Sequence, residues 1–480
     1  MLGKNNSISI LSFLEIITVV IICLFFVYLC LNDPKSVVSL GFVIFCIPLA
    51  FFSIKKTDNW LVSRDVTDEK KMLTYFMFIY PLLPCLWGIN IGGGIPVFRA
   101  QRIAALILIF YLYRRGLFRQ VYTDFIKANI FTYPIVFIII SFLITSFFST
   151  NMKGTFFYLF YFVFEILILP VVVFTVFKTR KDIELLINII CLSAFILSII
   201  GIYERITEYN FYSVFGAYDV SHAHALEHAR RFGSIRIKGP FMHSISFSSY
   251  LATTLPLFLY KYYNNSTKLI ISSGLVMFAL ISTQSRGGII GAILILGIYF
   301  TLYDRKNIFY ILLLSIPLIV LNYDSIAVFF NQLNPTGSSD QELANSSKAR
   351  SIQFEILSEY IKQNIIIGYG KVPTPAIMRI PGRYSRSVDN FYLLLTYSFG
   401  FFGLLSYVYL MINIIIKPIK ILGKKIYKDK LITLLLTGVF AFYIINTVVS
   451  LEEFHFIFWI YVGILARLLV NRLKGQNAWC

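Results

Sequence analysis

The sequence predicts an all-α integral membrane protein, and three observations lead to this prediction. Of the 480 residues, 58% are hydrophobic and only 14% are charged, a balance that soluble domains do not show. Apolar stretches recur at about the 20-residue length that a membrane-spanning helix needs. Basic residues gather on alternate loops between these stretches, as in chains that cross a membrane many times. We therefore expect one polytopic membrane domain over residues 1–480.

The apolar stretches predict about 14 transmembrane helices, or about 12 if short segments re-enter the membrane instead of crossing it. Pro81 and Pro84 interrupt the third stretch, and a glycine triplet at 92–94 follows it. The candidate helices begin near residues 9, 37, 72, 100, 129, 155, 183, 244, 267, 288, 307, 390, 431 and 454.

The basic loops predict the orientation. With the N-terminus inside, the clusters at 55–71, 114–127, 178–181 and 417–430 all fall on the same side. Lys and Arg in short loops mark the cytoplasmic side of a membrane protein. Both termini are therefore expected to be cytoplasmic.

Two longer loops, at about 205–243 and 322–388, then face outward, and long loops in compact proteins tend to be functional. The second predicts an amphipathic helix that begins after 345–347 and ends at Gly368. Such a helix would lie on the membrane surface, cover a cavity, or simply pack onto the bundle. Its expected apolar face consists of Ile352, Ile356, Leu357 and Tyr360.

Arginine on the outer side is the feature that points to a ligand. Of the 43 Lys and Arg residues, 17 would lie outside, and 11 of these are Arg. The inner side would carry 18 Lys and 8 Arg, which membrane insertion explains. A planar guanidinium holds phosphate oxygens in bidentate fashion, whereas Lys is a point charge. We therefore expect an anionic lipid headgroup to be held outside.

Three arginines are the main candidates for binding such a headgroup. Arg286 lies between two apolar runs, where an unpaired charge is costly, although an arginine there can also snorkel to the interface. The glycines at 287–288 would let the backbone turn towards a ligand. Arg236 precedes the next span, and Arg350 would open the amphipathic helix, whose N-terminus favours an anion.

Asp389 and His243 are the candidates for proton transfer. Asp389 closes the second loop at the mouth of a span, where its carboxylate could accept a proton from a hydroxyl group. Alternatively, its side-chain oxygen could cap the following helix. His243 is the second candidate base. Secondary site candidates are Asn390, Arg99 and Arg102.

Several function classes are not supported. The formal net charge of +19 would suggest nucleic acid, but the sequence lacks a basic stretch with interleaved aromatic residues. The histidines at 222, 224 and 228 lack a supporting carboxylate pair for a metal, and the six cysteines have no metal-ligand spacing. No phosphate-binding glycine motif for a nucleotide is present. We expect no metal, no cofactor and no nucleic-acid partner.

The order of these motifs resembles the Wzy/WaaL superfamily of O-antigen and capsule polymerases and O-antigen ligases. The ligases place His before Asn at the mouth of the span, where this chain has Asp389, and the chain is in this respect more similar to the polymerases. The segments that carry the resemblance are Arg236–His243, Thr283–Gly287, Ser347–Arg350, Ile367–Gly370, and Asp389–Asn390 followed by Gly400 and Gly403.

The resemblance implies a GT-C-like, lipid-sugar-dependent glycosyltransferase in the bacterial inner membrane, with its two long loops in the periplasm. As a polymerase it would transfer a glycan from undecaprenyl diphosphate to a repeat unit on the same lipid. Both substrates and the membrane lipids would be partners, and a chain-length regulator is a further candidate. Arg236, Arg286 and Arg350 would hold the donor diphosphate, and Asp389 or His243 would act on the acceptor.

Two alternatives remain at this stage. The first is an O-antigen ligase, which would transfer glycan to lipid A core. The second is a flippase or transporter of lipid-linked glycans, for which Glu15 and Glu165 within predicted spans are the supporting feature.

Overall fold

The computed structural model describes residues 67–89, 97–216, 229–231, 234–303, 341–372, 377–380, 383–385 and 388–474. The chain divides into two units, residues 1–71 and residues 72–480. Nearly all described residues belong to the second unit. The helices expected near residues 9, 37 and 307 lie outside the described residues.

The described residues are mostly helical, which confirms the predicted helical class for this part of the chain. A helix begins near every expected position that the described ranges include. The α-helices are α3 (Asp68–Ile79), α4 (Ala100–Arg114), α5 (Phe118–Ala128), α6 (Thr132–Phe148), α7 (Met152–Tyr161), α8 (Ile168–Val176), α9 (Arg180–Thr207), α10 (Ser244–Tyr262), α11 (Ser266–Ser282), α12 (Arg286–Tyr303), α15 (Gln341–Gln363), α16 (Phe391–Leu422), α17 (Lys430–Asn446) and α18 (His455–Leu473).

Short elements join or interrupt these helices. The strands among the described residues form three antiparallel two-stranded hairpins, each within a connecting loop. The hairpins pair β1 (Gly88–Ile89) with β2 (Phe98–Arg99), β3 (Arg230–Arg231) with β4 (Ser234–Ile235), and β5 (Ile377–Ile380) with β6 (Arg383–Ser385). The remaining turns are η1 (Tyr80–Leu82), the π-helical η2 (Phe162–Ile166), η3 (Phe211–Phe215) and η5 (Gly423–Lys428).

Five of the described helices are long and apolar enough to cross a membrane, or six if the bent pair α5 and α6 forms one span. The chain bends by 113° between these two helices. The five are the continuous stretch Met152–Val176, α9, α12, α16 and α18. They indicate a membrane protein. The count of about 14 also includes shorter helices and undescribed segments, so it stays a prediction.

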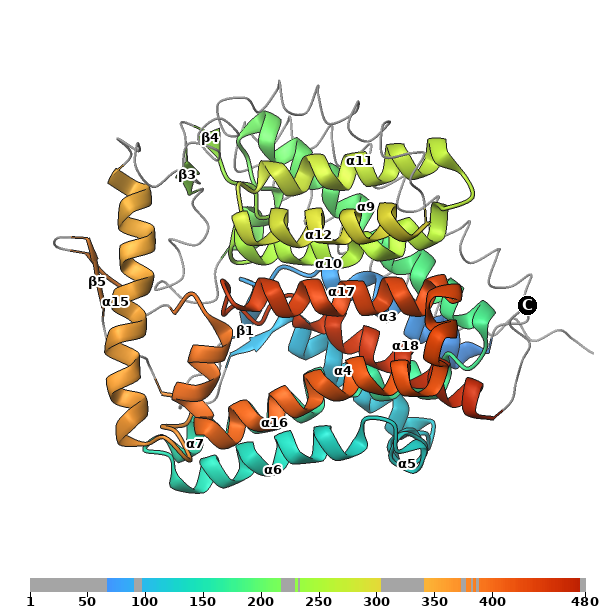
Figure 1. Ribbon diagram of the computed structural model, residues 1–480, viewed down its shortest axis with the longest axis horizontal. Coiled ribbons are helices and arrows are strands. Elements are labelled where there is room, and N and C mark those ends of the chain that lie inside the picture. The colour runs from blue at the N-terminus through green and yellow to red at the C-terminus, as the bar shows by residue number, and fades with distance from the viewer. Residues whose placement is uncertain are drawn as a thin grey trace, which may run out of the picture. The chain divides into compact units, whose positions relative to one another are not determined.

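Helix α10 lies at the centre of one part of the bundle and contacts α9, α11, α12 and α17. Figure 1 shows α11, α12 and α10 running side by side, with α17 beside them. On the other side of α17, α18 packs against α8, and α16 pairs with α6. Nearly every residue of α10 is buried.

Small residues let these helices approach closely. A Cβ added at Gly288 of α12 would lie 1.7 Å from the Ser248 Oγ of α10. Where lipid surrounds a bundle, such close packing replaces hydrophobic burial as the main force between helices. The glycines at 287–288 therefore serve helix packing, and our expectation that they turn the backbone was wrong. The turn before α12 is made instead by Gln284, whose φ is +53°.

Helix α15 confirms the predicted helix in the second loop, but with different ends. It runs from Gln341 to Gln363, so it begins and ends earlier than expected. Leu357 is fully buried and packs with Val388 and Tyr397 next to α16. Tyr360, on the same expected apolar face, is 39% exposed. The second half of α15 thus packs onto the bundle.

The segment after α15 is held against a kink in α16. The Gly370 N–H donates to the Ser398 carbonyl at 2.7 Å, one of several backbone bonds between the two segments. At the kink, Gly400 has φ +63° and ψ −169°, which is left-handed backbone inside a helix. A Cβ there would lie 2.2 Å from the Ile366 carbonyl oxygen. Glycine is therefore required by both backbone angle and space.

Candidate functional site

The turn between α17 and α18, residues 447–454, contacts both of the long loops, 205–243 and 322–388. Its Glu452 Oε1 accepts a hydrogen bond from the Lys371 Nζ at 3.2 Å, in the segment after α15. Its Glu453 Oε2 accepts one from the Met242 backbone N–H at 3.1 Å, just before α10. Segments that lie far apart in the sequence are thereby held at one end of the bundle.

Asp389 is anchored at the same place by its neighbours. The Ser450 hydroxyl, in the 447–454 turn, donates to the Val388 carbonyl. The Asp389 N–H donates to the Oε1 of Gln353 at 3.1 Å, and this Gln353 side chain is buried on α15. Asp389 therefore lies where α15, α16 and the 447–454 turn meet.

The cap of α16 is Asn390. Its Oδ1 accepts a hydrogen bond from the Leu393 N–H at 3.0 Å, the geometry of an N-cap. Asn390, one of the secondary site candidates, is therefore the residue that caps α16. The alternative role that the sequence left for Asp389, capping this helix, is therefore wrong.

His243 lies directly before α10, with an exposed side chain among charged groups. Partial removal from water lowers the pKa of His243 below its ordinary value of 6.5. Glu453 opposes this shift, Lys238 and Arg236 add to it, and Asp389 opposes it more weakly. The imidazole is thus uncharged at neutral pH, which is the form that can accept a proton. The hydrogen bonds that Met242 and Val388 make to the 447–454 turn place the residues next to them, His243 and Asp389, at this end of the bundle.

Arg236 joins this cluster to the start of α12. Its Nε donates to the Thr283 carbonyl at 3.1 Å. Three residues further on, Arg286 is the first residue of α12 and is half-buried. Two of the three arginines predicted to bind a diphosphate therefore come from adjacent segments. The N-terminus of α12 adds a partial positive charge at this point.

Arg350 is placed differently from its prediction. It lies nine residues after Gln341, the first residue of α15, and so more than two turns inside the helix. Its expected position at the helix N-terminus was wrong, because α15 begins before the Asn-Ser-Ser segment. Arg350 is one turn before Gln353, which binds the Asp389 backbone. Its side chain is outside the described part of the structure.

The secondary candidate Arg102 has a structural role. Its Nε lies 3.2 Å from the Glu165 Oε2, and its guanidinium lies 3.8 Å from the centre of the Tyr161 ring. It also donates to the Val97 carbonyl at 2.7 Å. Arg99, the residue before α4, is close enough to Glu165 to interact electrostatically. Glu165, which supported the transporter alternative, therefore has a charged partner, and Glu15 lies outside the described residues.

The sequence reasoning missed the pair Glu452 and Lys371. The Tyr158 hydroxyl also donates to Glu452, at 3.0 Å from each carboxylate oxygen. Burial raises the pKa of Glu452, but Lys371, His455 and the Tyr158 hydroxyl outweigh burial, so its pKa is lowered. One signal was available: two adjacent glutamates directly before the last apolar run.

A second missed residue, Glu204 near the end of α9, positions the segment that leads to His243. The Lys238 N–H and the Gly239 N–H donate to its carboxylate at 3.1 and 2.9 Å. Asn210 bonds both to Glu204 and to the Gly239 carbonyl. The carboxylate is fully buried, and these donors compensate its loss of water.

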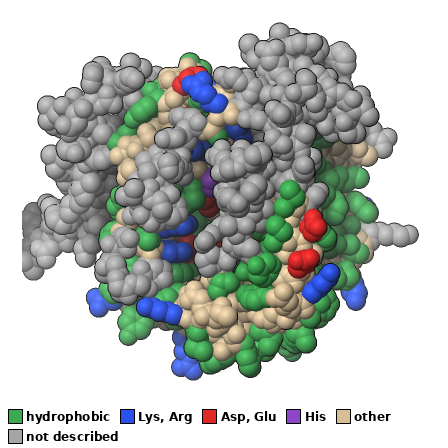
Figure 2. Space-filling model, turned by 90° about the vertical axis from the view of Figure 1, so that its left-hand side faces the viewer, with side chains coloured by type: hydrophobic (Ala, Val, Ile, Leu, Met, Phe, Trp, Pro, Cys, Tyr) green, Lys and Arg blue, Asp and Glu red, His purple; other side chains and the backbone are tan. Residues whose placement is uncertain are grey.

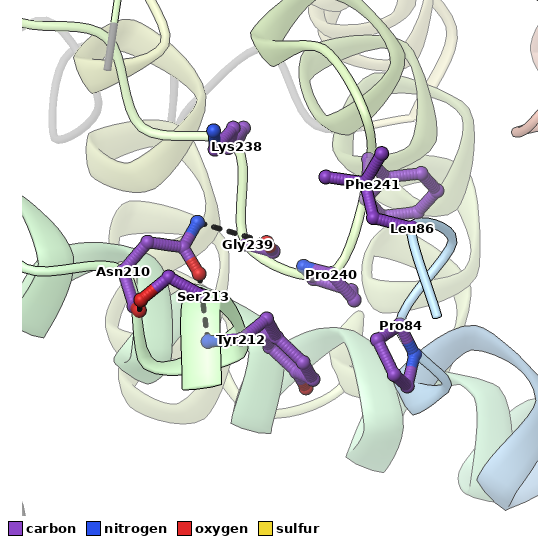
Figure 3. A pocket seen from close by; sticks show the side chains of 9 residues that line it. All are labelled: Pro84, Leu86, Asn210, Tyr212, Ser213, Lys238, Gly239, Pro240 and Phe241. Carbon is purple, nitrogen blue, oxygen red and sulfur yellow. Dashed lines mark hydrogen bonds between the residues drawn. The ribbon is translucent and has the colours of Figure 1, made fainter. Parts of the chain in front are cut away.

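A small pocket lies beside this segment. Figure 3 shows Asn210 bonded to Gly239 on one side and to the Tyr212 N–H on the other. The cavity volume is about 10 Å³, room for about one water molecule. The pocket therefore belongs to the support of the site and is too small for a sugar. Its lining is Pro84, Leu86, Asn210, Tyr212, Ser213, Lys238, Gly239, Pro240 and Phe241.

The charged residues gather at one end of the bundle. Figure 2 shows the face at which α15 lies in Figure 1, with basic, acidic and His side chains together in its middle. Among the residues that the structure describes, no group of three or more His, Cys, Asp or Glu could hold a metal ion. The histidines at 222, 224 and 228 are outside these residues, so metal independence stays a prediction.

Comparison with known proteins gives one family match. No protein of curated function matches the sequence. The model of the O-antigen ligase family, Wzy_C, matches residues 271–408. The matched segment includes Arg286, Arg350 and Asp389, and it leaves out the segment around His243 and the 447–454 turn. Over this segment the chain is similar to the O-antigen ligase family, in line with the resemblance to the Wzy/WaaL superfamily.

Proposed function

We propose that the protein is a polysaccharide polymerase with a GT-C-like mode of action. It joins undecaprenyl-diphosphate-linked repeat units on the periplasmic face of the bacterial inner membrane. The observation that supports this most is the gathering of Arg236 and His243, from the segment before α10, with Asp389, from the start of α16, next to the start of α12. A cation, a neutral imidazole and a carboxylate at the same end of the bundle suit the transfer of a sugar from a diphosphate.

The electrostatics of this end of the bundle favour a diphosphate. Four helices, α10, α12, α16 and α18, all begin here, and a helix N-terminus carries about half a positive charge. Arg236 and Arg286 add two guanidinium groups, and Arg350 is the third candidate. Charge-assisted hydrogen bonds contribute about 1.5–3 kcal/mol each. Two or three of them would hold the donor without a metal ion.

The proposed reaction is a direct displacement at the anomeric carbon of the donor sugar. The acceptor hydroxyl forms the new carbon–oxygen bond as the bond to the diphosphate breaks, and undecaprenyl diphosphate leaves with the electron pair. The hydroxyl proton passes to Asp389, with His243 as the second candidate base. The arginines stabilise the charge that develops on the leaving diphosphate. The configuration inverts, and no nucleotide is needed because the sugar–phosphate bond supplies the free energy.

This proposal is tested in cells that lack the native enzyme. Arg286→Ala and Asp389→Ala should each leave only single-repeat glycans, with the amount of membrane-inserted protein unchanged. Arg230→Ala is the matched control, because Arg230 is an exposed arginine on an outward hairpin, paired with Glu208 at 2.6 Å. It should retain long chains. Long chains in both site variants would remove the proposed roles.

An O-antigen ligase is the second candidate, and the description of the matching family favours it. A ligase would transfer finished glycan to lipid A core. Deleting the gene separates the two functions. Loss of a ligase leaves long lipid-linked chains without an acceptor, whereas loss of a polymerase leaves no long chains. Under the polymerase proposal, a chain-length regulator is a further partner.

A further inference from the structure

A charged cavity lies at the opposite ends of the helices that form the candidate site. Helix α18 begins at that site with His455 and ends at Leu473, where it meets the last turns of α5 and α8. The cavity between these three ends has a volume of about 500 Å³. In Figure 1, α5 lies on the right and α15 on the left, at opposite sides of the bundle.

The cavity is lined by four cationic side chains and one carboxylate. The cations are Lys127, Lys178, Arg467 and Lys474, and the carboxylate is Asp124. The three lysines are exposed, while Arg467 is partly buried with its guanidinium 5.2 Å from the centre of the Phe174 ring. The cavity thus carries an excess of positive charge.

The interaction of cations with helix C-termini explains only part of the positive charge in this cavity. Helix C-termini attract cations, because their last carbonyl groups carry partial negative charge. Arg467 serves this role, since its Nε donates to the Lys178 carbonyl at 3.3 Å, and Asn471 donates to the same carbonyl at 3.0 Å. The lysine side chains lie outside this contact. The cavity, at about 500 Å³, is also many times larger than the roughly 30 Å³ that one water molecule occupies in the liquid.

The rest of the lining is apolar apart from Thr175, and it indicates the level of the membrane surface. Phe174, Val470 and Leu473 line the cavity, and they belong to the last turns of two helices long enough to span a membrane. A site with an apolar side and a cationic mouth at such a level fits a phospholipid, whose phosphate lies where the acyl chains begin. We propose that this cavity binds the headgroup phosphate of an anionic phospholipid.

The test is a ligand titration of the purified full-length protein in a neutral detergent. Phosphatidylglycerol should raise the midpoint of thermal unfolding, and phosphatidylcholine should not. The double variant Lys127→Glu and Lys178→Glu should raise the half-saturating lipid concentration about tenfold or more. Lys420→Glu is the control, because Lys420 is an exposed lysine at the end of α16, outside the cavity. It should bind lipid like the wild type.

Two results would overturn the proposal: no midpoint shift in the wild type, or the same lipid dependence in the cavity variant and the control. Inorganic phosphate is titrated in parallel. If it shifts the midpoint as strongly as phosphatidylglycerol at equal concentration, the ligand is free phosphate and the lipid assignment fails. Lys474→Glu alone should weaken binding as well. Lys474 lies beyond α18 and is exposed, so this variant keeps the test valid if the double variant does not fold.

Discussion

At the scale of single residues, Asp389 and Asn390 divide two tasks between them. The Asn390 side chain caps α16, and the Asp389 backbone is tied to Gln353 of α15. The carboxylate of Asp389 is close enough to His243 to influence its pKa. A chemical role for this carboxylate can therefore be tested apart from helix capping.

The substitution Asp389→Asn preserves the size of the side chain and removes its basicity. We expect chain growth to fall by about 100-fold, the lower end of the usual contribution of a general base. Thermal stability should change little. Asn390→Ala should do the opposite, with a loss of about 1 kcal/mol of stability from the missing cap and chain growth retained. Glycan length and unfolding midpoint measured on both variants test this. Long chains with Asp389→Asn would exclude the base.

The pH dependence of chain growth tests His243. Its folded pKa lies below 6.5, so the unfolded chain binds more protons near pH 6, and stability falls as the pH falls through that range. If His243 accepts the proton, the rate is constant at neutral pH and falls only below 6.5. The residual activity of His243→Gln should lack this acidic limb. An identical limb in the variant would assign the titration to another group.

At the scale of elements, the helices were predictable and several of their contacts were not. Apolar runs of span length gave the starts of α9, α10, α12 and α16 closely, because each needs a continuous lipid-facing or buried surface. Helix α15 begins with polar residues, so its start at Gln341 carried no apolar signal. The bonds between the segment after α15 and the kink at Gly400 join backbone groups, which leave no side-chain pattern beyond the glycines themselves.

The close packing of α10 and α12 predicts how two glycine substitutions on α12 change the stability of the protein. Gly288→Ala would place a Cβ 1.7 Å from the Ser248 Oγ and 3.0 Å from its backbone carbonyl carbon. We expect a loss of about 1–3 kcal/mol, because the two helices must separate. Gly297→Ala, on the same helix with nothing within 4 Å, should be neutral or stabilising by up to about 1 kcal/mol. Thermal unfolding of both purified variants measures the difference. Equal midpoints would contradict the packing role.

At the scale of the whole molecule, the candidate site is assembled from pieces that the sequence separates widely. The sequence alone identified four of these residues, Arg236, His243, Arg286 and Asp389. Each is a polar or charged group next to a membrane span, where such groups are costly and are therefore candidates for function. Of their supports, Glu452 left one signal, its place in a pair of glutamates before the last apolar run, whereas Glu204 and Lys371 left none. The partners of all three lie on other segments, and such pairing only becomes visible when the helices are packed.

The two ends of the bundle carry different kinds of charge. The end where α10, α12, α16 and α18 begin combines arginines with acidic residues and His243. The other end carries the lysine-rich cavity around Arg467. This difference is consistent with the orientation predicted from the basic loops, in which the lysine-rich end faces the cytoplasm. It also separates the proposed diphosphate site from the proposed phospholipid site.

The most direct test of the central claim is turnover by the purified protein, reconstituted in vesicles with undecaprenyl-diphosphate-linked repeat units as the sole glycan. A chelator is present, and nucleotides and lipid A core are left out. The account predicts glycans of two or more repeats together with released undecaprenyl diphosphate, and loss of both products with Arg286→Ala. Unchanged single-repeat substrate after incubation with the wild-type protein, followed by transfer once lipid A core is added, would contradict it.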